Sequence, residues 1–184
     1  KEACAELTTV YSSFQSAGRG QRGNSWESEA GKNLLFSFVV YPEFLEAHRQ
    51  FYLSQVTALA LHDVLSSYTE GISIKWPNDI YWKDKKICGT LIENDLTGIH
   101  ISRSISGTGV NLNQERFISD APNPVSLCQI TGNQYNPREI LEQIMEKLGR
   151  WYDVEVVFAA DDARSQRFSG RVDRSEDFRD VLNL

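Results

Sequence analysis

Three glycines and two arginines lie within six residues near the start of the chain, and this cluster is the first pattern that could do chemistry. The segment GRGQRG, from Gly18 to Gly23, matches the G-x-G-x-x-G pattern of dinucleotide-binding loops. That pattern needs a helix directly after the glycines, whereas here a polar stretch and then an apolar strand follow. A P-loop is also disfavoured, because Lys32 is followed by Asn33 and not by Ser or Thr.

The glycine loop, residues 15–33, still suits an anionic ligand. Glycines let the backbone approach a ligand closely, and Arg19 and Arg22 supply fixed positive charge. In an acidic protein this concentration of arginine favours a phosphate or a carboxylate. A surface loop with solvated arginines is the alternative, and the pattern alone leaves both open.

A second cluster is Lys75-Trp76-Pro77-Asn78-Asp79. Proline cannot continue a central strand, so we expect the chain to turn at Pro77 and to direct Asn78 and Asp79 toward a neighbour. The alternative is a purely structural turn with Trp76 in the core.

A lysine and further glycines follow. Lys86 precedes Gly89 in a predicted strand, where its ammonium could lie over a ligand, although isolated lysines are usually solvated. The segment GTGVN, from Gly107 to Asn111, ends another strand. Its glycines permit close approach and the Asn111 amide could contact a base or a ribose, whereas a plain turn is the alternative.

Taken together, GRGQRGNSW, KWPNDIYW, KKICGTLIE and GTGVNLN resemble, in this order, the biotin protein ligase family. The resemblance runs from Ser12 to Trp151. It implies an α+β fold of the class II aminoacyl-tRNA-synthetase-like type, in which helices flank a mixed β-sheet. It also implies a catalytic domain at residues 1–153 and a small SH3-like β module at residues 154–184.

The family resemblance implies a ligase that uses ATP, biotin and Mg²⁺. Such an enzyme forms biotinyl-5′-AMP and pyrophosphate, then transfers biotin to a lysine of the biotin carboxyl carrier domain of acetyl-CoA carboxylase or a related carboxylase. A carboxylate that attacks the α-phosphate brings two anions together, so cationic side chains must neutralise the developing charge.

Matching the motifs assigns a role to each site residue. The resemblance gives catalytic roles to Arg19, Asp79 and Lys86. The biotin-binding residues would be Gln15, Gly18, Arg19, Arg22, Lys86, Gly89 and Gly107. The ATP- or adenylate-binding residues would be Arg22, Trp26, Asn78, Lys86 and Asn111. No residue is assigned as a metal ligand.

Two other functions stay open. A lipoate or octanoyl ligase or transferase of the same superfamily would be expected to carry an RRxSGGG-type loop, which GRGQRG is not. A non-catalytic binder of biotin or nucleotide fits two departures from the family pattern. Gln21 stands where many members have a second arginine, and no ETxSTN segment precedes the glycine loop.

The elements that must position these residues can be predicted from periodicity. We expect strands at residues 8–14, 33–40, 72–76, 79–82, 86–93 and 99–113, in a mixed or antiparallel sheet. We expect helices at residues 45–68 and 137–151, the second with Asn136 as N-cap and an apolar stripe that ends at Trp151. Short strands are predicted at residues 154–158, 168–172 and 178–184.

Composition limits the class of protein. The 184 residues include 19 Lys plus Arg and 25 Asp plus Glu, a formal net charge of −6, which disfavours DNA as a partner. The hydrophobic fraction of 41% is enough for a globular core. Three scattered cysteines and the lack of a long apolar run predict a cytoplasmic protein with no membrane segment. The resemblance also allows a homodimer.

Overall fold

A six-stranded β-sheet forms the centre of the molecule, in the order β1-β4-β8-β7-β6-β5. The computed structural model describes residues 4–119, 123–153 and 156. The strands of this sheet are β1 (Thr9–Ser12), β4 (Leu34–Val40), β5 (Ile72–Lys75), β6 (Asp79–Trp82), β7 (Lys85–Thr97) and β8 (His100–Val110). Each neighbouring pair of these strands is antiparallel, so the α+β class and the antiparallel alternative are confirmed, whereas the mixed sheet that the resemblance implies is wrong for the described strands.

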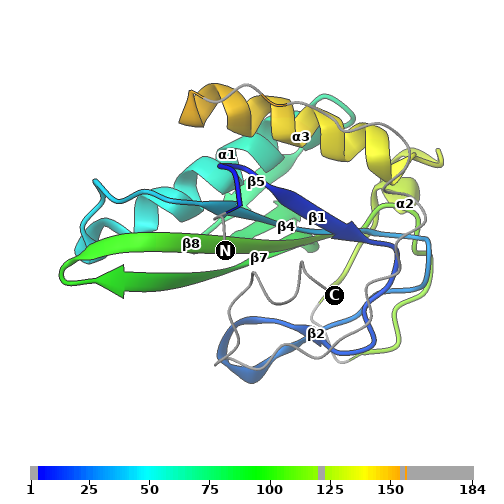
Figure 1. Ribbon diagram of the computed structural model, residues 1–184. Coiled ribbons are helices and arrows are strands. Elements are labelled where there is room, and N and C mark those ends of the chain that lie inside the picture. Colours follow the sequence, from blue (N-terminus) through cyan, green and yellow to red (C-terminus); the bar gives the residue numbers. More distant parts are fainter. Residues whose placement is uncertain (1–3, 120–122, 154–155, 157–184) are drawn as a thin grey trace.

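The long helices α1 (Phe51–Ser66) and α3 (Pro137–Tyr152) pack on one face of this sheet (Figure 1). Strand β4 is apolar along nearly its whole length and is buried on both faces, as its sequence predicts. Its residues Phe36 and Phe38 belong to the core between the sheet and the helices. The expectation of helices flanking the sheet is therefore met on one face in the described part of the chain.

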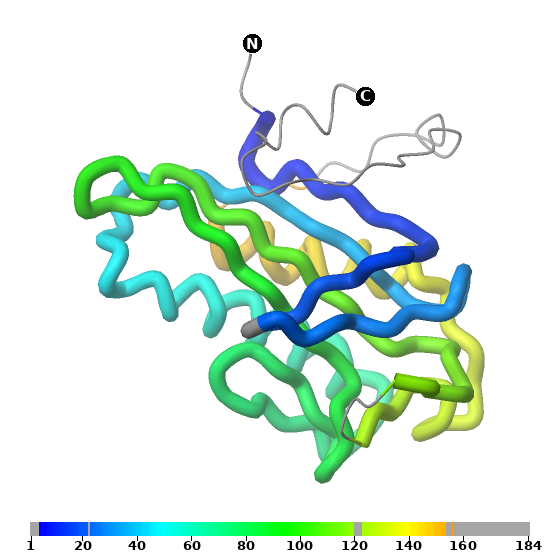
Figure 2. The backbone as a smooth tube through the Cα atoms, turned by 90° about the horizontal axis from the view of Figure 1, so that it is seen from below, coloured from blue at the N-terminus to red at the C-terminus, as the bar shows by residue number. Residues whose placement is uncertain are grey.

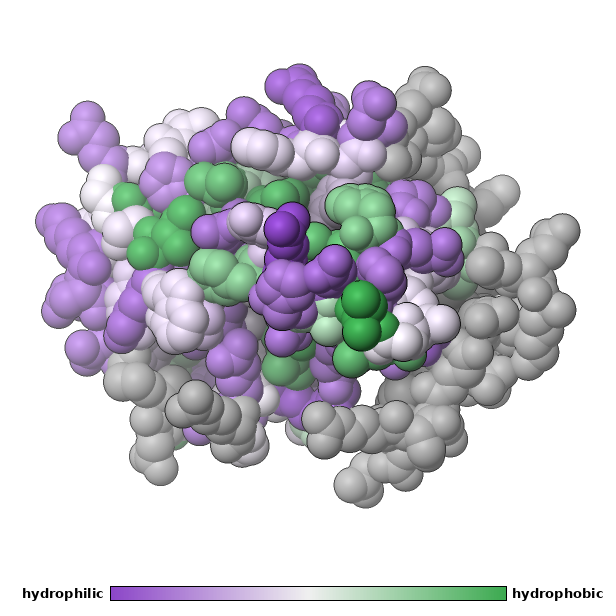
Figure 3. All heavy atoms as spheres, turned by 90° about the vertical axis from the view of Figure 1, so that its left-hand side faces the viewer, coloured by the Kyte–Doolittle hydropathy of each residue, from purple (hydrophilic) through white to green (hydrophobic). Residues whose placement is uncertain are grey.

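Helix α1 begins at Phe51 rather than at residue 45. The preceding segment is held by the β7–β8 hairpin, because Ala47 N donates to Ile99 O at 2.8 Å and Ile101 N donates to Leu45 O at 2.9 Å. These bonds keep the chain extended before the short 3₁₀ helix η2 (Ala47–Arg49). Figure 3 shows this end of the molecule, where apolar and polar side chains are interspersed on the surface.

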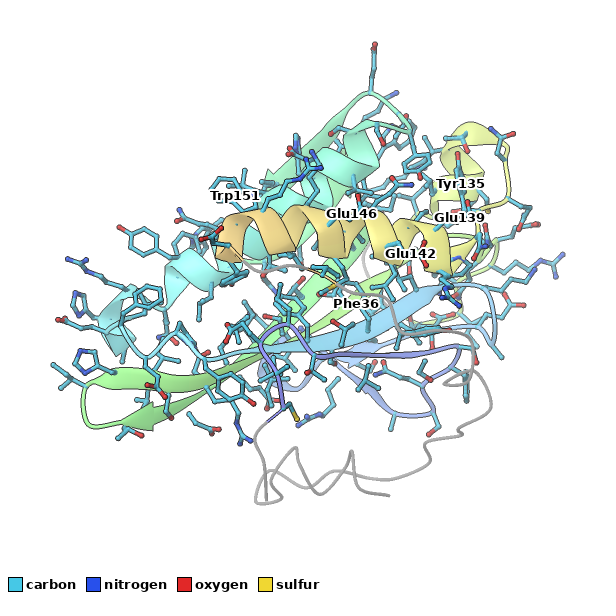
Figure 4. All side chains as sticks on the ribbon, turned by 45° about the horizontal axis from the view of Figure 1, so that its top comes forward. Phe36, Tyr135, Glu139, Glu142, Glu146 and Trp151 are labelled. Atoms are coloured by element: carbon cyan, nitrogen blue, oxygen red, sulfur yellow. The ribbon has the colours of Figure 1, made fainter. Side chains whose placement is uncertain are left out.

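Helix α3 begins as predicted, with the Asn136 side chain accepting a hydrogen bond from Arg138 N at 3.0 Å. Its apolar stripe is buried up to Leu148, but Trp151 is 56% exposed at the helix end, so that part of the stripe was wrong (Figure 4). The short helix α2 (Leu127–Thr131) was not predicted; it begins with a capping box formed by Ser126 and Gln129.

On the opposite face of the sheet, the glycine loop forms a small hairpin. Its strands are β2 (Gly18–Arg19) and β3 (Ser25–Trp26), joined by the 3₁₀ turn η1 (Gln21–Gly23). In Figure 2, seen from below, this blue segment lies across the central strands. Among the described helices, none has the length and apolar character needed to cross a bilayer.

The predicted strands beyond residue 153, and with them the C-terminal β module, lie outside the described residues apart from Val156. The division of the chain at residue 153 therefore stays a prediction.

Candidate functional site

A cavity of about 500 Å³ lies between the glycine loop and strands β6, β7 and β8. It opens on the face of the sheet that carries no helix in Figure 1. Most residues singled out from the sequence line it, namely Gln15, Arg19, Trp26, Asn78, Asp79, Lys86, Gly89 and Gly107. Motifs separated by up to about ninety positions are thus brought to one site.

Strand register explains why the glycines are spaced as they are. Leu35, Gly109, Gly89 and Asp79 lie opposite one another across four strands, so they share one face of the sheet. Gly107 lies two residues from Gly109 on the same face. We call Gly89, Gly107 and Gly109 the glycine floor of the cavity.

The indole of Trp26 rests on the part of this floor that Gly89 and Gly109 form. A Cβ atom at Gly109 would lie only 2.3 Å from Trp26 Cε2, and one at Gly89 would lie 3.1 Å from Trp26 Cζ3. Trp26 Nε1 is buried and has no hydrogen-bond partner among the described residues. Gly109 was absent from the predicted site, although the two-residue spacing of GTG in a strand could have indicated it.

Lys86 is paired with an acid and is not a solvated lysine. Its Nζ lies 2.8 Å from Asp79 Oδ1, and the two side chains are only 27% and 21% exposed. Lys86 Nζ also lies 5.8 Å from the centre of the Trp26 ring. The predicted catalytic residues Lys86 and Asp79 therefore form one polar unit beside the glycine floor.

Arg19 and Glu93 form a second ion pair at a more open part of the cavity. Arg19 Nη2 lies 3.2 Å from Glu93 Oε2, with side chains 57% and 42% exposed. Glu93 was missed in the sequence, yet its distance of four residues from Gly89 in a strand puts both on one face. The backbone of Arg22 is described, but its side chain lies outside the described part of the chain.

The KWPND turn is fastened to β7. Asn78 Nδ2 donates to Thr90 O, and Thr90 N donates to Asn78 O at 3.1 Å. Trp76 is 74% exposed and its ring lies 5.7 Å from that of Phe51, so the alternative that places Trp76 in the core is wrong. Asp79 and Asn78 both face the cavity, as the turn predicts.

Of the predicted site residues whose side chains the structure describes, two do not line the cavity. Gly18 supports it indirectly, because a Cβ there would lie 2.5 Å from Trp26 O within the β2–β3 hairpin. Asn111 is buried and donates from Nδ2 to Val125 O at 3.2 Å, which holds the segment before α2 against the end of β8. Asn111 Oδ1 has no hydrogen-bond partner among the described residues.

The return of the glycine loop to the sheet is anchored by side-chain hydrogen bonds. Gln114 Oε1 accepts from Asn33 Nδ2 at 2.6 Å, and its Nε2 donates to Glu27 Oε1 at 2.9 Å. Burial raises the pKa of Glu27, but hydrogen bonds from Ser119, Ile118 and Gln114 outweigh it and leave the pKa lowered. The second half of the loop is thereby fixed.

Known proteins share sequence and fold with this chain. The family model for the biotin/lipoate A/B protein ligase family matches residues 4–111, more than half of the chain. A model for the C-terminal region of FecR matches residues 138–184, a smaller part. The biotin–[acetyl-CoA-carboxylase] ligase of Paracoccus denitrificans is 35% identical over 151 residues, which are 77% of this chain and 61% of that protein.

Solved structures show the same architecture. A biotin protein ligase from Aquifex aeolicus in complex with biotin and ATP aligns with a TM-score of 0.69 at 30% identity, over 82% of this chain and 62% of that one. The Leishmania major enzyme in complex with biotinyl-5-AMP has a TM-score of 0.66 at 22% identity, over 94% and 77%, and supports the fold alone. The chain spans about three fifths of the length of the Paracoccus relative, with 61% covered. On the family match, the chain belongs to the biotin/lipoate A/B protein ligase family.

Proposed function

We propose that the chain is the catalytic part of an ATP-dependent biotin protein ligase. It would activate biotin as biotinyl-5′-AMP and transfer it to a lysine of the biotin carboxyl carrier domain of acetyl-CoA carboxylase or a related carboxylase. The observation that carries this proposal is the cavity, which gathers the glycine loop, the Lys86–Asp79 pair and the glycine floor.

The side chains in the cavity suit an attack of one anion on another. Lys86 and Arg19 would offset the charge that develops when a carboxylate approaches an α-phosphate. Asp79 holds the Lys86 ammonium in place at 2.8 Å until an anion competes for it. The glycine floor would let the flat body of a ligand lie close to the sheet, with Trp26 displaced from it or stacked on it.

ATP, biotin and Mg²⁺ are the ligands we assign to the cavity. The described residues contain no group of three or more His, Cys, Asp or Glu side chains that could hold a metal. Magnesium is commonly bound by one or two carboxylates together with substrate phosphates, so Asp79 and the ATP phosphates fit it. Its part would be to neutralise phosphate charge.

Lipoate is the second candidate substrate, since the matching family model covers both biotin and lipoate ligases. Biotin is favoured because relatives and solved structures similar to this chain carry biotin ligase names.

We also propose a reducing, cytoplasmic location. The cysteines Cys4, Cys88 and Cys128 are free, and burial raises the pKa of the Cys88 thiol.

The proposal is tested by mixing the full chain with ATP, labelled biotin and a purified carrier domain. We expect release of pyrophosphate and label on the carrier, and no label when the target lysine of the carrier is changed to arginine. Lipoate in place of biotin is expected to be a poor substrate. Binding of biotin without release of pyrophosphate would favour a non-catalytic binder, and labelling by lipoate alone would favour the lipoate alternative.

A further inference from the structure

We propose that Asn111 is a positioning residue that holds the backbone of Lys86 through Val125 and so fixes the Lys86 ammonium in the cavity lining. The inference rests on the proposed function, in which Lys86 acts on the α-phosphate. The juxtaposition behind it joins three parts of the chain, namely the start of β7, the end of β8 and the segment that leads into α2.

Lys86 lies where the regular pairing of β7 gives out on both sides. Strand β8 ends at Val110, which pairs with Cys88, so β8 does not reach Lys86. On the other side the pairing with β6 is irregular, because its register shifts between Ile80 and Tyr81. The central strands alone therefore leave the backbone of Lys86 weakly supported.

The segment that precedes α2 supplies the missing support. It runs beside β7 in a parallel bridge between Pro124 and Lys86. Val125 N donates to Lys86 O at 2.9 Å, and Lys86 N donates to Asn123 O at 2.9 Å. Because a residue has one backbone N–H and one carbonyl, both polar groups of the Lys86 backbone are bonded to this segment.

Asn111 fastens this segment to the end of β8. Its Nδ2 donates to Val125 O at 3.2 Å, and its backbone carbonyl accepts from Leu127 N at 2.9 Å. Its backbone N–H donates to Ile87 O at 2.9 Å, directly beside Lys86. Asn111 is 3% exposed, so water competes little for these bonds. The Asn111 side chain is thus connected to Lys86 through a single residue, Val125.

A shift of the Lys86 backbone would move its ammonium. Lys86 Nζ lies 2.8 Å from Asp79 Oδ1, and both side chains line the cavity. A misplacement of about 1 Å near the reacting atoms can lower a rate about a hundredfold. Removing the Asn111 amide should therefore lower kcat, while the KM for biotin should stay at the wild-type value.

Asn113 is a matched control two residues further along the chain. It is also buried, with its Nδ2 donating to Tyr135 O at 2.7 Å and its Oδ1 accepting from Tyr135 N at 2.9 Å. These bonds hold the segment before α3 and not the segment beside Lys86. Asn113→Ala removes two hydrogen bonds, so it should lower the melting temperature at least as much as Asn111→Ala without moving Lys86.

The test measures pyrophosphate release, the melting temperature and hydrogen exchange at the Val125 and Lys86 amides, relative to the amides of β4. For Asn111→Ala we expect kcat about ten- to a hundredfold lower, and exchange at both amides about three- to tenfold faster, as the loss of one hydrogen bond gives. Asn111→Thr is close to asparagine in size and lacks the Nδ2 amide, so it should act alike and serves if Asn111→Ala does not fold. Asn113→Ala should keep kcat and both exchange ratios at the wild-type values.

Three outcomes would overturn the proposal. Unchanged exchange at Val125 and Lys86 in the Asn111 variants would show that the side chain does not hold the segment. Equal losses of kcat in Asn111→Ala and Asn113→Ala would show a general effect of stability. A change confined to the KM for ATP would show that Asn111 contacts the nucleotide and does not position Lys86. If the wild type releases no pyrophosphate, the proposed function fails, while the exchange at both amides still decides whether Asn111 holds Lys86.

Discussion

Replacing Gly109 by alanine should release Trp26 from the sheet without unfolding the protein. The added Cβ would lie 2.3 Å from Trp26 Cε2 and 2.5 Å from Nε1. Ordinary contacts between carbon atoms are about 3.5–4.0 Å, so the indole must retreat by roughly 1 Å or more. The backbone of Gly109 cannot move instead, because it is paired with Leu35 on one side and Gly89 on the other.

The size of the effect on hydrogen exchange follows from the contacts that attach the β2–β3 hairpin to the sheet. Strands β2 and β3 have two residues each, so the contact of Trp26 with the glycine floor is a large part of their attachment. Burial of a large apolar side chain is worth about 1.5–3 kcal/mol. Losing it should make the amides of residues 18–26 exchange on the order of ten- to a hundredfold faster. The melting temperature should change little, because Trp26 is not part of the helix-side core.

Gly107→Ala is the matched control on the same strand and the same face. Its Cβ would approach nothing closer than Ser37 Oγ at 3.4 Å, so Trp26 should stay in place and loop exchange should stay at the wild-type value. The extra methyl would instead enter the cavity and weaken biotin binding. Equal exchange in the two variants would refute the reasoning, because Trp26 would then not depend on the absence of a side chain at Gly109.

Three further predictions concern the rest of the site and the fold. Lys86→Ala should lower the rate of pyrophosphate release on the order of a hundredfold. It should also destabilise the fold by about 1–3 kcal/mol, because Asp79 is left unpaired. Lys85 is exposed, so Lys85→Ala should change neither the rate nor the melting temperature appreciably. Because the pKa of Glu27 is lowered, its hydrogen bonds stabilise the loop fully above the ordinary pKa of 4.5. This stabilisation is lost as the pH falls through the lowered pKa. Hydrogen exchange at the Ile118 amide should therefore rise in acid in the wild type but not in Glu27→Gln. Ser126→Ala should cost about 1 kcal/mol in urea unfolding by removing the capping box of α2, and an unchanged midpoint would contradict that assignment.

The strands could be predicted because each is an uninterrupted run rich in apolar and β-branched residues that is bounded by turn residues. Strands β4, β5 and β6 lie within one residue of the predicted ranges, and the Asn136 cap places α3 correctly. The start of α1 could not be predicted, since hydrogen bonds between the distant β7–β8 hairpin and Leu45 and Ala47 hold the chain extended at Glu46, before the 3₁₀ helix η2. Helix α2 was missed because five residues give too short a periodic signal.

The candidate site was predictable as a set of motifs but not as a set of contacts. The sequence located Lys86 and Asp79 separately, yet a bulge at Ile80 and Tyr81 decides how the strands that carry them are paired. Trp26 could be assigned to the loop, but not to the surface on which it rests. Glu93 was overlooked because an acidic residue in a strand does not indicate a binding site unless that face of the strand is known to line a cavity.

Among the described side chains that line the cavity, the two ion pairs balance the charge, and this balance constrains how an anion can bind. Two cations near one ligand site would repel each other if both were unpaired, and Asp79 and Glu93 remove that repulsion. An anion that enters must therefore compete with a carboxylate at each cation. The competition is easier at the exposed Arg19 than at the more buried Lys86, because water screens the Arg19 pair. An anionic ligand should thus engage Arg19 before it fully engages Lys86, the cation proposed to act on the α-phosphate.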